Sequence, residues 1–160
     1  MQYFYWNKSF EVGIPEIDLQ HRGLVDLINT LATIIVDGGR LPDAQSLLGQ
    51  LMEYSAVHFC SEERLMDTCS LTEEEKKRHR KEHHGFVTKA REIVLRPDLL
   101  QAEVAEQVLE FLTIWLISHI LGSDMKIARA LAQEGTGSER KDQQLFEISP
   151  VERLLLGALT

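Results

Sequence analysis

Apolar side chains recur at steps of three and four residues along most of this chain, a spacing that places them on one face of an α-helix. No stretch alternates between apolar and polar residues as a half-buried β-strand does. The spacing predicts four helices, over about 17–38, 43–69, 72–96 and 98–133. Because the connections between them are short, we expect an all-α fold, an up-down-up-down four-helix bundle.

Residues with strong preferences for helix ends support these boundaries. Gly38 and Gly39 are expected to end the first helix. Thr72 and Glu75 form the capping-box pattern that opens the third helix, and Pro97 is expected to stop it.

The chain divides into one large domain and a tail. Residues 1–133 are expected to form the helical domain, with an extended N-terminal arm over 1–16, where no helical period is found. Residues 134–148 are polar and predict a linker. Residues 149–160 open with Ser-Pro-Val-Glu, a helix-start pattern, and predict a short C-terminal helix. That helix either packs on the bundle or begins a signalling connector to an output domain.

The composition narrows the classes of function. The 160 residues carry a formal net charge of −8, which argues against nucleic acid and anionic membrane surfaces as partners. The N-terminus lacks a signal-peptide pattern, and the longest apolar run, Phe111 to Gly122, is too short to span a bilayer. Cys60 and Cys69 make no disulfide framework. We therefore expect a soluble cytoplasmic protein that uses no membrane.

Histidines and carboxylates interrupt the apolar faces of the predicted helices. His58 and Glu62 are four residues apart, as are His79 and His83, so each pair shares one helix face. A single histidine on such a face is usually a hydrogen-bonded core residue, and a buried carboxylate is costly unless it is paired or binds a metal. So many polar groups converging in one core predict a metal site. The candidate ligands are His21, His58, Glu62, His79, His83, His119 and Asp124.

The fourth helix presents a geometric problem, because His119 and Asp124 are five residues apart. A regular α-helix rotates residues at that spacing by about 140° from each other. Either the aspartate side chain reaches across, or the helix widens locally, as π-bulges do at functional sites. Gly122 would ease such a distortion. We therefore predict irregular hydrogen bonding within residues 119–124.

The donor set indicates which metal is expected. Seven ligands exceed the needs of one ion, so two ions that share bridging carboxylates are the simplest arrangement. Imidazole with carboxylate suits iron, with zinc and manganese as alternatives. No cysteine belongs to the set, which disfavours a structural zinc site.

The motifs that contain these residues resemble those of bacterial hemerythrin domains, over about residues 4–132. The matching positions are Trp6, Val12-Gly13-Ile14, Ile17-Asp18 and His21, then His58-Phe59-x-x-Glu62-Glu63, His79-x-x-x-His83-x-x-Phe86 and Trp115-Leu116-x-x-His119-Ile120-x-x-x-Asp124.

The resemblance implies a non-haem di-iron centre, two Fe ions with an oxo or hydroxo bridge. It implies that one iron is bound by His79, His83 and His119 and the other by His21 and His58. Glu62 and Asp124 would bridge the two.

The resemblance also implies reversible binding of O2, and of azide or similar anions by the oxidised form. O2 is expected at the iron with two histidines, because that iron keeps an open position. A dry pocket is expected from Phe59, Trp115, Leu116 and Ile120, since water would disturb the bound state.

Three functions remain open from the sequence. The leading one is O2 binding for oxygen or redox sensing, or for O2 storage and delivery. The second is a di-iron enzyme that consumes O2, peroxide or NO, and the third is an iron sensor. Bundle di-iron oxidases use four glutamates and two histidines. Five imidazoles with two carboxylates place less negative charge on the irons, which favours reversible binding by a protein that is not an enzyme.

Overall fold

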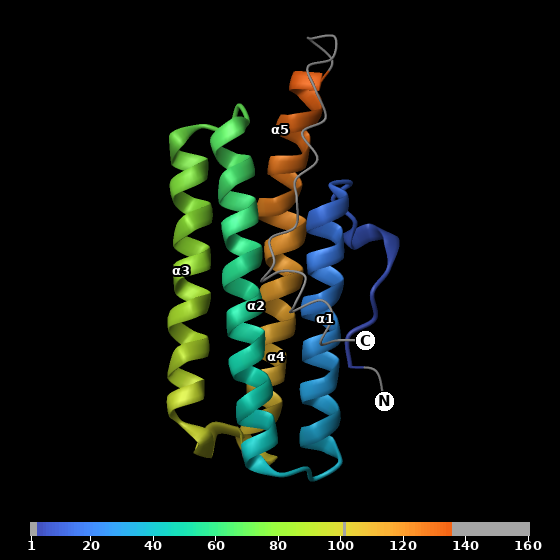
Figure 1. Cartoon of the computed structure of the whole chain (residues 1–160), viewed down its shortest axis with the longest axis vertical. Helices are drawn as coiled ribbons and strands as arrows, with labels where there is room; N and C mark the ends of the chain where they lie inside the picture. The colour runs from blue at the N-terminus through green and yellow to red at the C-terminus, as the bar shows by residue number, and fades with distance from the viewer. Residues whose placement is uncertain (1–2, 101, 136–160) are drawn as a thin grey trace.

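The computed structural model describes residues 3–100 and 102–135, which form a bundle of long helices lying side by side (Figure 1). After a 3-10 turn, η1 (Lys8–Phe10), the order is α1 (Pro15–Val36), α2 (Leu41–Thr68) and α3 (Glu73–Leu95), then the 3-10 turn η2 (Pro97–Leu100), α4 (Ala102–His119), the π-helical η3 (Ile120–Asp124) and α5 (Met125–Gly135). These described ranges contain no β-strand. The predicted all-α four-helix bundle is confirmed.

The helices follow one another as antiparallel neighbours. α1 packs on α2 and on α4, and α2 packs on α3. α4, η3 and α5 are one continuous helix, whose last turns extend beyond α2 and α3 at the top of Figure 1. Each helix therefore turns one face inward, and the four inward faces meet along the bundle axis.

Two helices begin earlier than expected. α1 begins at Pro15, not near Ile17, and α2 begins at Leu41, not near Asp43. In both helices a proline occupies the first turn. The reason is that proline lacks an N–H group, and the first-turn N–H groups have no partner within a helix anyway.

The fourth helix also begins differently from the expectation. It was expected from Asp98, but residues 97–100 form the 3-10 turn η2 and α4 begins only at Ala102. The side chain of Arg96 donates to the Asp98 carboxylate at 2.9 Å, and Leu99 N–H donates to the Arg96 carbonyl at 2.9 Å. These local bonds favour a tight turn over a regular helix.

The expected helix-end signals act as predicted. Gly38 adopts φ 67°, the left-handed conformation that favours glycine, and Gly39 N–H donates to the Ile34 carbonyl at 2.7 Å. At the start of α3, Glu75 N–H donates to Thr72 Oγ1 at 3.2 Å, and Thr72 N–H donates to Glu75 Oε2 at 3.0 Å. The capping box is therefore complete.

The predicted irregularity between His119 and Asp124 is confirmed as the π-helical segment η3. The N–H of Met125 donates to the Ile120 carbonyl, five residues earlier, where an α-helix would use four. The extra residue turns Asp124 onto the inner face that His119 already occupies, and both side chains are buried.

The N-terminal arm is held against α1 by two polar side chains. The Asn29 amide accepts from Phe4 N–H at 2.7 Å and donates to the Phe4 carbonyl at 2.9 Å. The Asp18 carboxylate accepts from Val12 N–H at 2.7 Å and from Gly13 N–H at 3.0 Å. These side-chain bonds satisfy backbone groups of the arm that would pair with a neighbouring strand in a β-sheet. The arm therefore follows the outer side of α1 (Figure 1).

The C-terminal part of the expected domain organisation is not covered by the structure. α5 continues through 134–135, the first two residues of the predicted linker. The rest of the predicted 134–148 linker, residues 136–148, and the predicted C-terminal helix (149–160) lie outside the described residues.

The continuous helix of α4, η3 and α5 is longer than the apolar run that the sequence suggested. By length and composition alone, residues 104–134 are long and apolar enough to cross a membrane. Core helices of soluble proteins pass the same test. Here the helix buries its apolar face against the other three, together with His119 and Asp124.

We predict that Gly23→Ala destabilises the bundle. A Cβ at Gly23, in α1, would lie 2.7 Å from Cζ of the buried Tyr54 ring in α2. Overpacking costs about 1–3 kcal/mol, which exceeds the gain of about 1 kcal/mol from replacing a helical glycine. Chemical denaturation should therefore show a lower free energy of unfolding.

Gly49→Ala is the matched control. Gly49 lies in α2 and a Cβ there would meet nothing within 4 Å, so this variant should be more stable than the starting protein. Equal stabilisation by both substitutions would show that α1 and α2 do not approach closely at Gly23.

Candidate metal centre

The seven candidate ligands lie together inside the bundle, although they come from all four of its long helices. Each is at most 3% exposed. Their ligand atoms form two groups, and within each group all of these atoms lie within 4.8 Å of one another. One group is Glu62, His79, His83 and His119, and the other is His21, His58, Glu62 and Asp124.

Glu62 belongs to both groups because its two oxygens point to different sides. Oε1 lies 2.9 Å from Nε2 of His58, whereas Oε2 lies 2.9 Å from Nε2 of His83 and 3.4 Å from Nε2 of His79. The carboxylate therefore spans the gap between the two groups.

Asp124 spans the same gap from the opposite wall. Its Oδ2 lies 3.1 Å from Nε2 of His21, and its Oδ1 lies 3.3 Å from Nε2 of His79 and 3.2 Å from Nε2 of His119. This position depends on η3, since a regular helix would turn Asp124 away from His119.

The outward nitrogens of the histidines establish which nitrogen bears the proton. Nδ1 of His83 lies 3.0 Å from Oε1 of Glu63, and Nδ1 of His119 lies 2.9 Å from Oε2 of Glu82. An ionised carboxylate can only accept, so in each pair Nδ1–H donates. In the neutral imidazole Nε2 then presents a lone pair to the interior.

Those inward lone pairs face one another. Nε2 of His119 lies 3.1 Å from Nε2 of His79 and 3.0 Å from Nε2 of His83. Two unprotonated nitrogens at that distance would repel each other, so a proton or a metal ion must lie between them. The geometry therefore fits a metal ion bound by the three imidazoles.

The second group shows the same feature. Within the described part of the chain, Nε2 of His58, Oε1 of Glu62 and Oδ1 of Asp124 are buried without a hydrogen bond, although Nε2 of His58 and Oε1 of Glu62 lie only 2.9 Å apart. Buried polar atoms are almost always paired, and the chemistry of these three atoms fits the coordination of a cation. Imidazole and carboxylate are a donor set suited to iron.

The carboxylates make the site attractive to positive charge. Burial alone would lower the pKa of His21, but hydrogen bonds and charge from Asp124 and Glu62 raise it to about 9. Burial also opposes protonation of His119, but Asp124, Glu62 and Glu82 raise its pKa to about 10. The interior therefore favours positive charge at these two histidines.

The pKa values of His58 and Glu62 also depend on the balance between burial and neighbouring charge. Burial dominates at His58 and lowers its pKa. Burial would raise the pKa of Glu62, but the imidazoles of His58, His119 and His21 hold it well below its usual range. Glu62 is therefore an anion despite its burial, as a bridging ligand must be.

The residues expected to form the dry pocket lie beside the imidazoles. Phe59 stacks on His83 at 4.0 Å between ring centroids, and Trp115 stacks on His119 at 4.4 Å. Leu116 and Ile120 are buried. Phe59 and Trp115 thus cover the three-histidine group.

A small apolar cavity of about 10 Å³ lies next to the centre. Trp115 and Leu116 line it, and so does Ser55, whose hydroxyl donates to the Leu51 carbonyl at 2.7 Å. A water molecule needs about 10–15 Å³ and two or more polar partners, so this cavity disfavours water. Its full lining is Leu24, Ile28, Leu51, Ser55, Phe86, Leu112, Trp115 and Leu116.

Three residues that contact the ligand histidines were not predicted from the sequence patterns. Gln20, Glu63 and Glu82 hold the outward nitrogens of three histidines, but none lies on an apolar stripe. Their one signal is position, because each is the immediate neighbour of a candidate ligand in the sequence. Glu63 also belongs to the motif that resembles the hemerythrin domain, where it had been given no role.

The chain is similar in sequence to known proteins. The family described as the Hemerythrin HHE cation binding domain matches residues 12–131. A hemerythrin-like protein of Naegleria gruberi is 33% identical over 123 residues, which is 77% of this chain and 89% of that protein. A bacteriohemerythrin of Clostridium acetobutylicum is 27% identical over 125 residues, 76% of this chain and 95% of that protein. A myohemerythrin of Theromyzon tessulatum is 28% identical over 123 residues, 77% of this chain and 89% of that protein. The family match includes all seven candidate ligands, and the chain therefore belongs to the hemerythrin family.

Proposed function

We propose that this chain binds O2 reversibly at a di-iron centre held by the seven buried side chains. Proteins of the hemerythrin family bind O2 at such a centre. The observation that supports the proposal most directly is the cluster of inward-facing imidazole nitrogens, which approach to 3.0 Å beside two carboxylates that each lie close to histidines of both groups. A buried arrangement of this kind needs cations on both sides.

Each side chain has a distinct task in this proposal. Three imidazoles would hold one ion and two imidazoles the other, while the two carboxylates would link them. When bound, the iron pair would supply the electrons that O2 binding requires and recover them on release. The residues are, in that order, His79, His83 and His119, then His21 and His58, then Glu62 and Asp124.

The group with only two imidazoles is the side where O2, or azide on the oxidised form, would bind. His21 and His58 supply one imidazole fewer than the other group, and an open position is typical of reactive metal sites. Leu24 and Ser55, which line the apolar cavity, lie one turn from His21 and His58. Phe86 and Trp115 of the same lining lie one turn from His83 and His119, so the cavity lies about one turn from both halves of the centre. Its apolar lining would favour a small apolar molecule such as O2 over water, and at about 10 Å³ the lining side chains would have to move to admit it.

For the biological role, we propose oxygen or redox sensing in the cytoplasm, with O2 storage and delivery as the other use of the same chemistry. The support is in the sequence after Gly135, where a polar stretch precedes an apolar segment with a helix-start pattern. Such a segment is suited to connect the bundle to an output domain. The five-imidazole donor set supports binding over oxidase chemistry.

We predict that the iron-loaded protein contains two irons per chain, and that His58→Ala or Glu62→Ala lowers this number. Each substitution removes a buried ligand atom from the site. Metal analysis of the purified variants gives the stoichiometry. His84→Ala is the matched control, since His84 lies in α3 beside His83 but is exposed. One zinc per chain without iron would contradict the proposal.

Reversibility has its own measurement. The reduced, iron-loaded protein should change its visible spectrum in air and recover it when O2 is removed. An irreversible change with turnover of O2 would instead support the enzyme alternative.

We predict that Leu116→Phe blocks O2 binding while iron content is unchanged. Leu116 is buried and lines the apolar cavity, so a larger side chain fills the space proposed for O2. Leu116→Asn should instead admit water and accelerate autoxidation. O2 titration of the reduced protein measures the first effect, and decay of the oxygenated spectrum measures the second.

Ile114→Phe is the control for this pair, because Ile114 lies in α4 but is 55% exposed. It should bind O2 like the starting protein. Normal O2 affinity in Leu116→Phe would show that O2 does not use this cavity.

A further inference from the structure

The two histidine groups differ in the chemistry of their outer partners. On the three-histidine side, the Nδ1–H groups of His83 and His119 donate to the carboxylates of Glu63 and Glu82, at 3.0 Å and 2.9 Å. On the two-histidine side, Nδ1 of His58 lies 3.0 Å from the amide oxygen of Gln20. One half of the site is therefore supported by anions and the other by a neutral amide.

Glu82 is fixed in this position by a second donor. The hydroxyl of Ser123 donates to the same Oε2 at 2.6 Å. Ser123 belongs to η3 and precedes Asp124, so the π-helical segment that turns Asp124 inward also brings this hydroxyl to Glu82. The Glu82 side chain is 35% exposed, and the hydroxyl leaves its negative charge in place.

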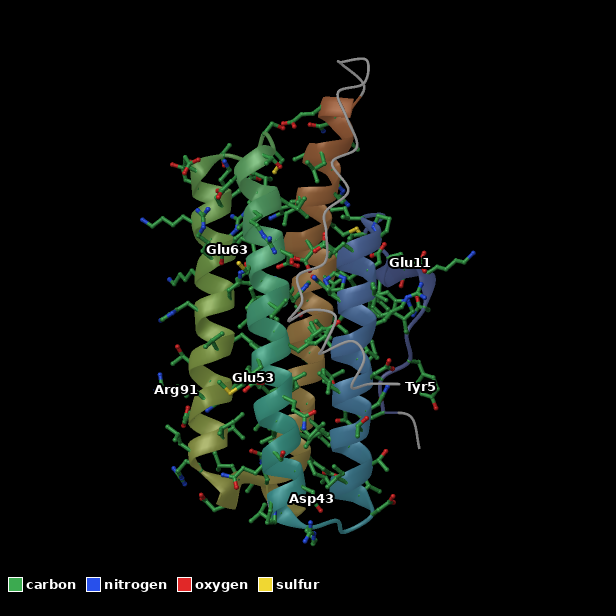
Figure 2. All side chains as sticks on the ribbon, viewed as in Figure 1. Tyr5, Glu11, Asp43, Glu53, Glu63 and Arg91 are labelled. Atoms are coloured by element: carbon green, nitrogen blue, oxygen red, sulfur yellow. The ribbon has the colours of Figure 1, made fainter. Side chains whose placement is uncertain are left out.

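Glu63 supports His83 in the same way, but its effect on the histidine is expected to be smaller. It lies in the upper part of α2 in Figure 2, and its Oε2 is 3.7 Å from Nε of Arg80. The guanidinium offsets part of its charge. The larger effect on the histidines is therefore expected from Glu82.

The side chain of Gln20 is also fixed by two hydrogen bonds, but it is neutral. Its Nε2 donates to Ser61 Oγ at 3.1 Å and to Glu16 Oε1 at 3.4 Å, which turns Oε1 toward His58. Nδ1 of the other histidine in this half, His21, has no hydrogen-bond partner among the residues that the structure describes. Neither imidazole of this half is supported by a carboxylate at its outer nitrogen.

We propose that Glu82, assisted by Glu63, is a positioning residue that makes the two halves of the centre unequal, so that the three-histidine half binds its metal ion more tightly. A carboxylate that accepts from a ligand histidine fixes its tautomer and makes its other nitrogen a stronger donor. The inference rests on the proposed di-iron site. Its consequence is an order of loading, in which the ion held by His21 and His58 enters last and leaves first.

The test is an anaerobic titration of the full metal-free chain with Fe²⁺ against a competing chelator. The starting protein should bind two ions in two steps. His58→Ala should keep only the tighter step, which would assign that step to the half with His79, His83 and His119. Glu82→Gln preserves the shape but removes the charge, and should weaken the tighter step by about 10- to 100-fold. The weaker step should stay within about twofold of the starting value, since Glu82 does not touch His21 or His58.

The reciprocal substitution is Gln20→Glu, which places a carboxylate behind His58. It should strengthen the weaker step and leave the tighter one unchanged. Glu82→Asp should restore part of the affinity lost in Glu82→Gln. A role limited to stability would shift both steps together and lower the unfolding temperature of the metal-free chain.

Glu53→Gln is the matched control for charge. Glu53 is exposed and lies lower on α2 in Figure 2, so this variant loses one carboxylate far from the histidines and should leave both steps unchanged. If the starting protein binds two ions and Glu82→Gln weakens neither step or both equally, the inference is overturned and the proposed function stands. Fewer than two ions in the starting protein would overturn both.

Discussion

The structure depends on the repulsion among polar atoms that the fold forces together. Nε2 of His119 lies 3.1 Å from Nε2 of His79 and 3.0 Å from Nε2 of His83, and the carboxylates of Glu62 and Asp124 are buried beside them. Without cations such a core would be strongly unfavourable, because water cannot compensate the buried charges. The surrounding apolar faces provide the packing energy that holds the ligands in place, and bound metal would remove the repulsion. Folding and metal binding are therefore coupled in this chain.

The π-helical segment solves a geometric constraint that follows from the same site. A ligand five residues after His119 cannot share its face on a regular α-helix. Widening the helix over Ile120–Asp124 corrects the angle, and the same change places Ser123 next to Glu82. One local departure from regular geometry thus positions a ligand and a supporting hydroxyl. This explains why the irregularity lies in the middle of an otherwise continuous helix.

Much of this arrangement could be predicted from local properties of the sequence. Helical periodicity gave the four faces, the polar residues on those faces gave the candidate ligands, and the five-residue spacing gave η3. Helix starts at Pro15 and Leu41 were missed because apolar periodicity begins after the cap. The outer partners were missed for a different reason. Gln20 and His58 are 38 residues apart and Glu82 and His119 are 37 apart, so their contacts arise only when the helices pack.

The exclusion of water follows from the same packing that makes the cations necessary. Phe59 and Trp115 lie flat against His83 and His119 and cover those ring faces with apolar surface. The cavity about one turn from the histidines is apolar, and its one hydroxyl, on Ser55, already donates to a backbone carbonyl. A neutral diatomic molecule loses little on entering such a space, whereas a water molecule would lose most of its hydrogen bonds. Selectivity for O2 over water would therefore come from the scarcity of polar partners, and the ligand groups would need no specific contact to distinguish them.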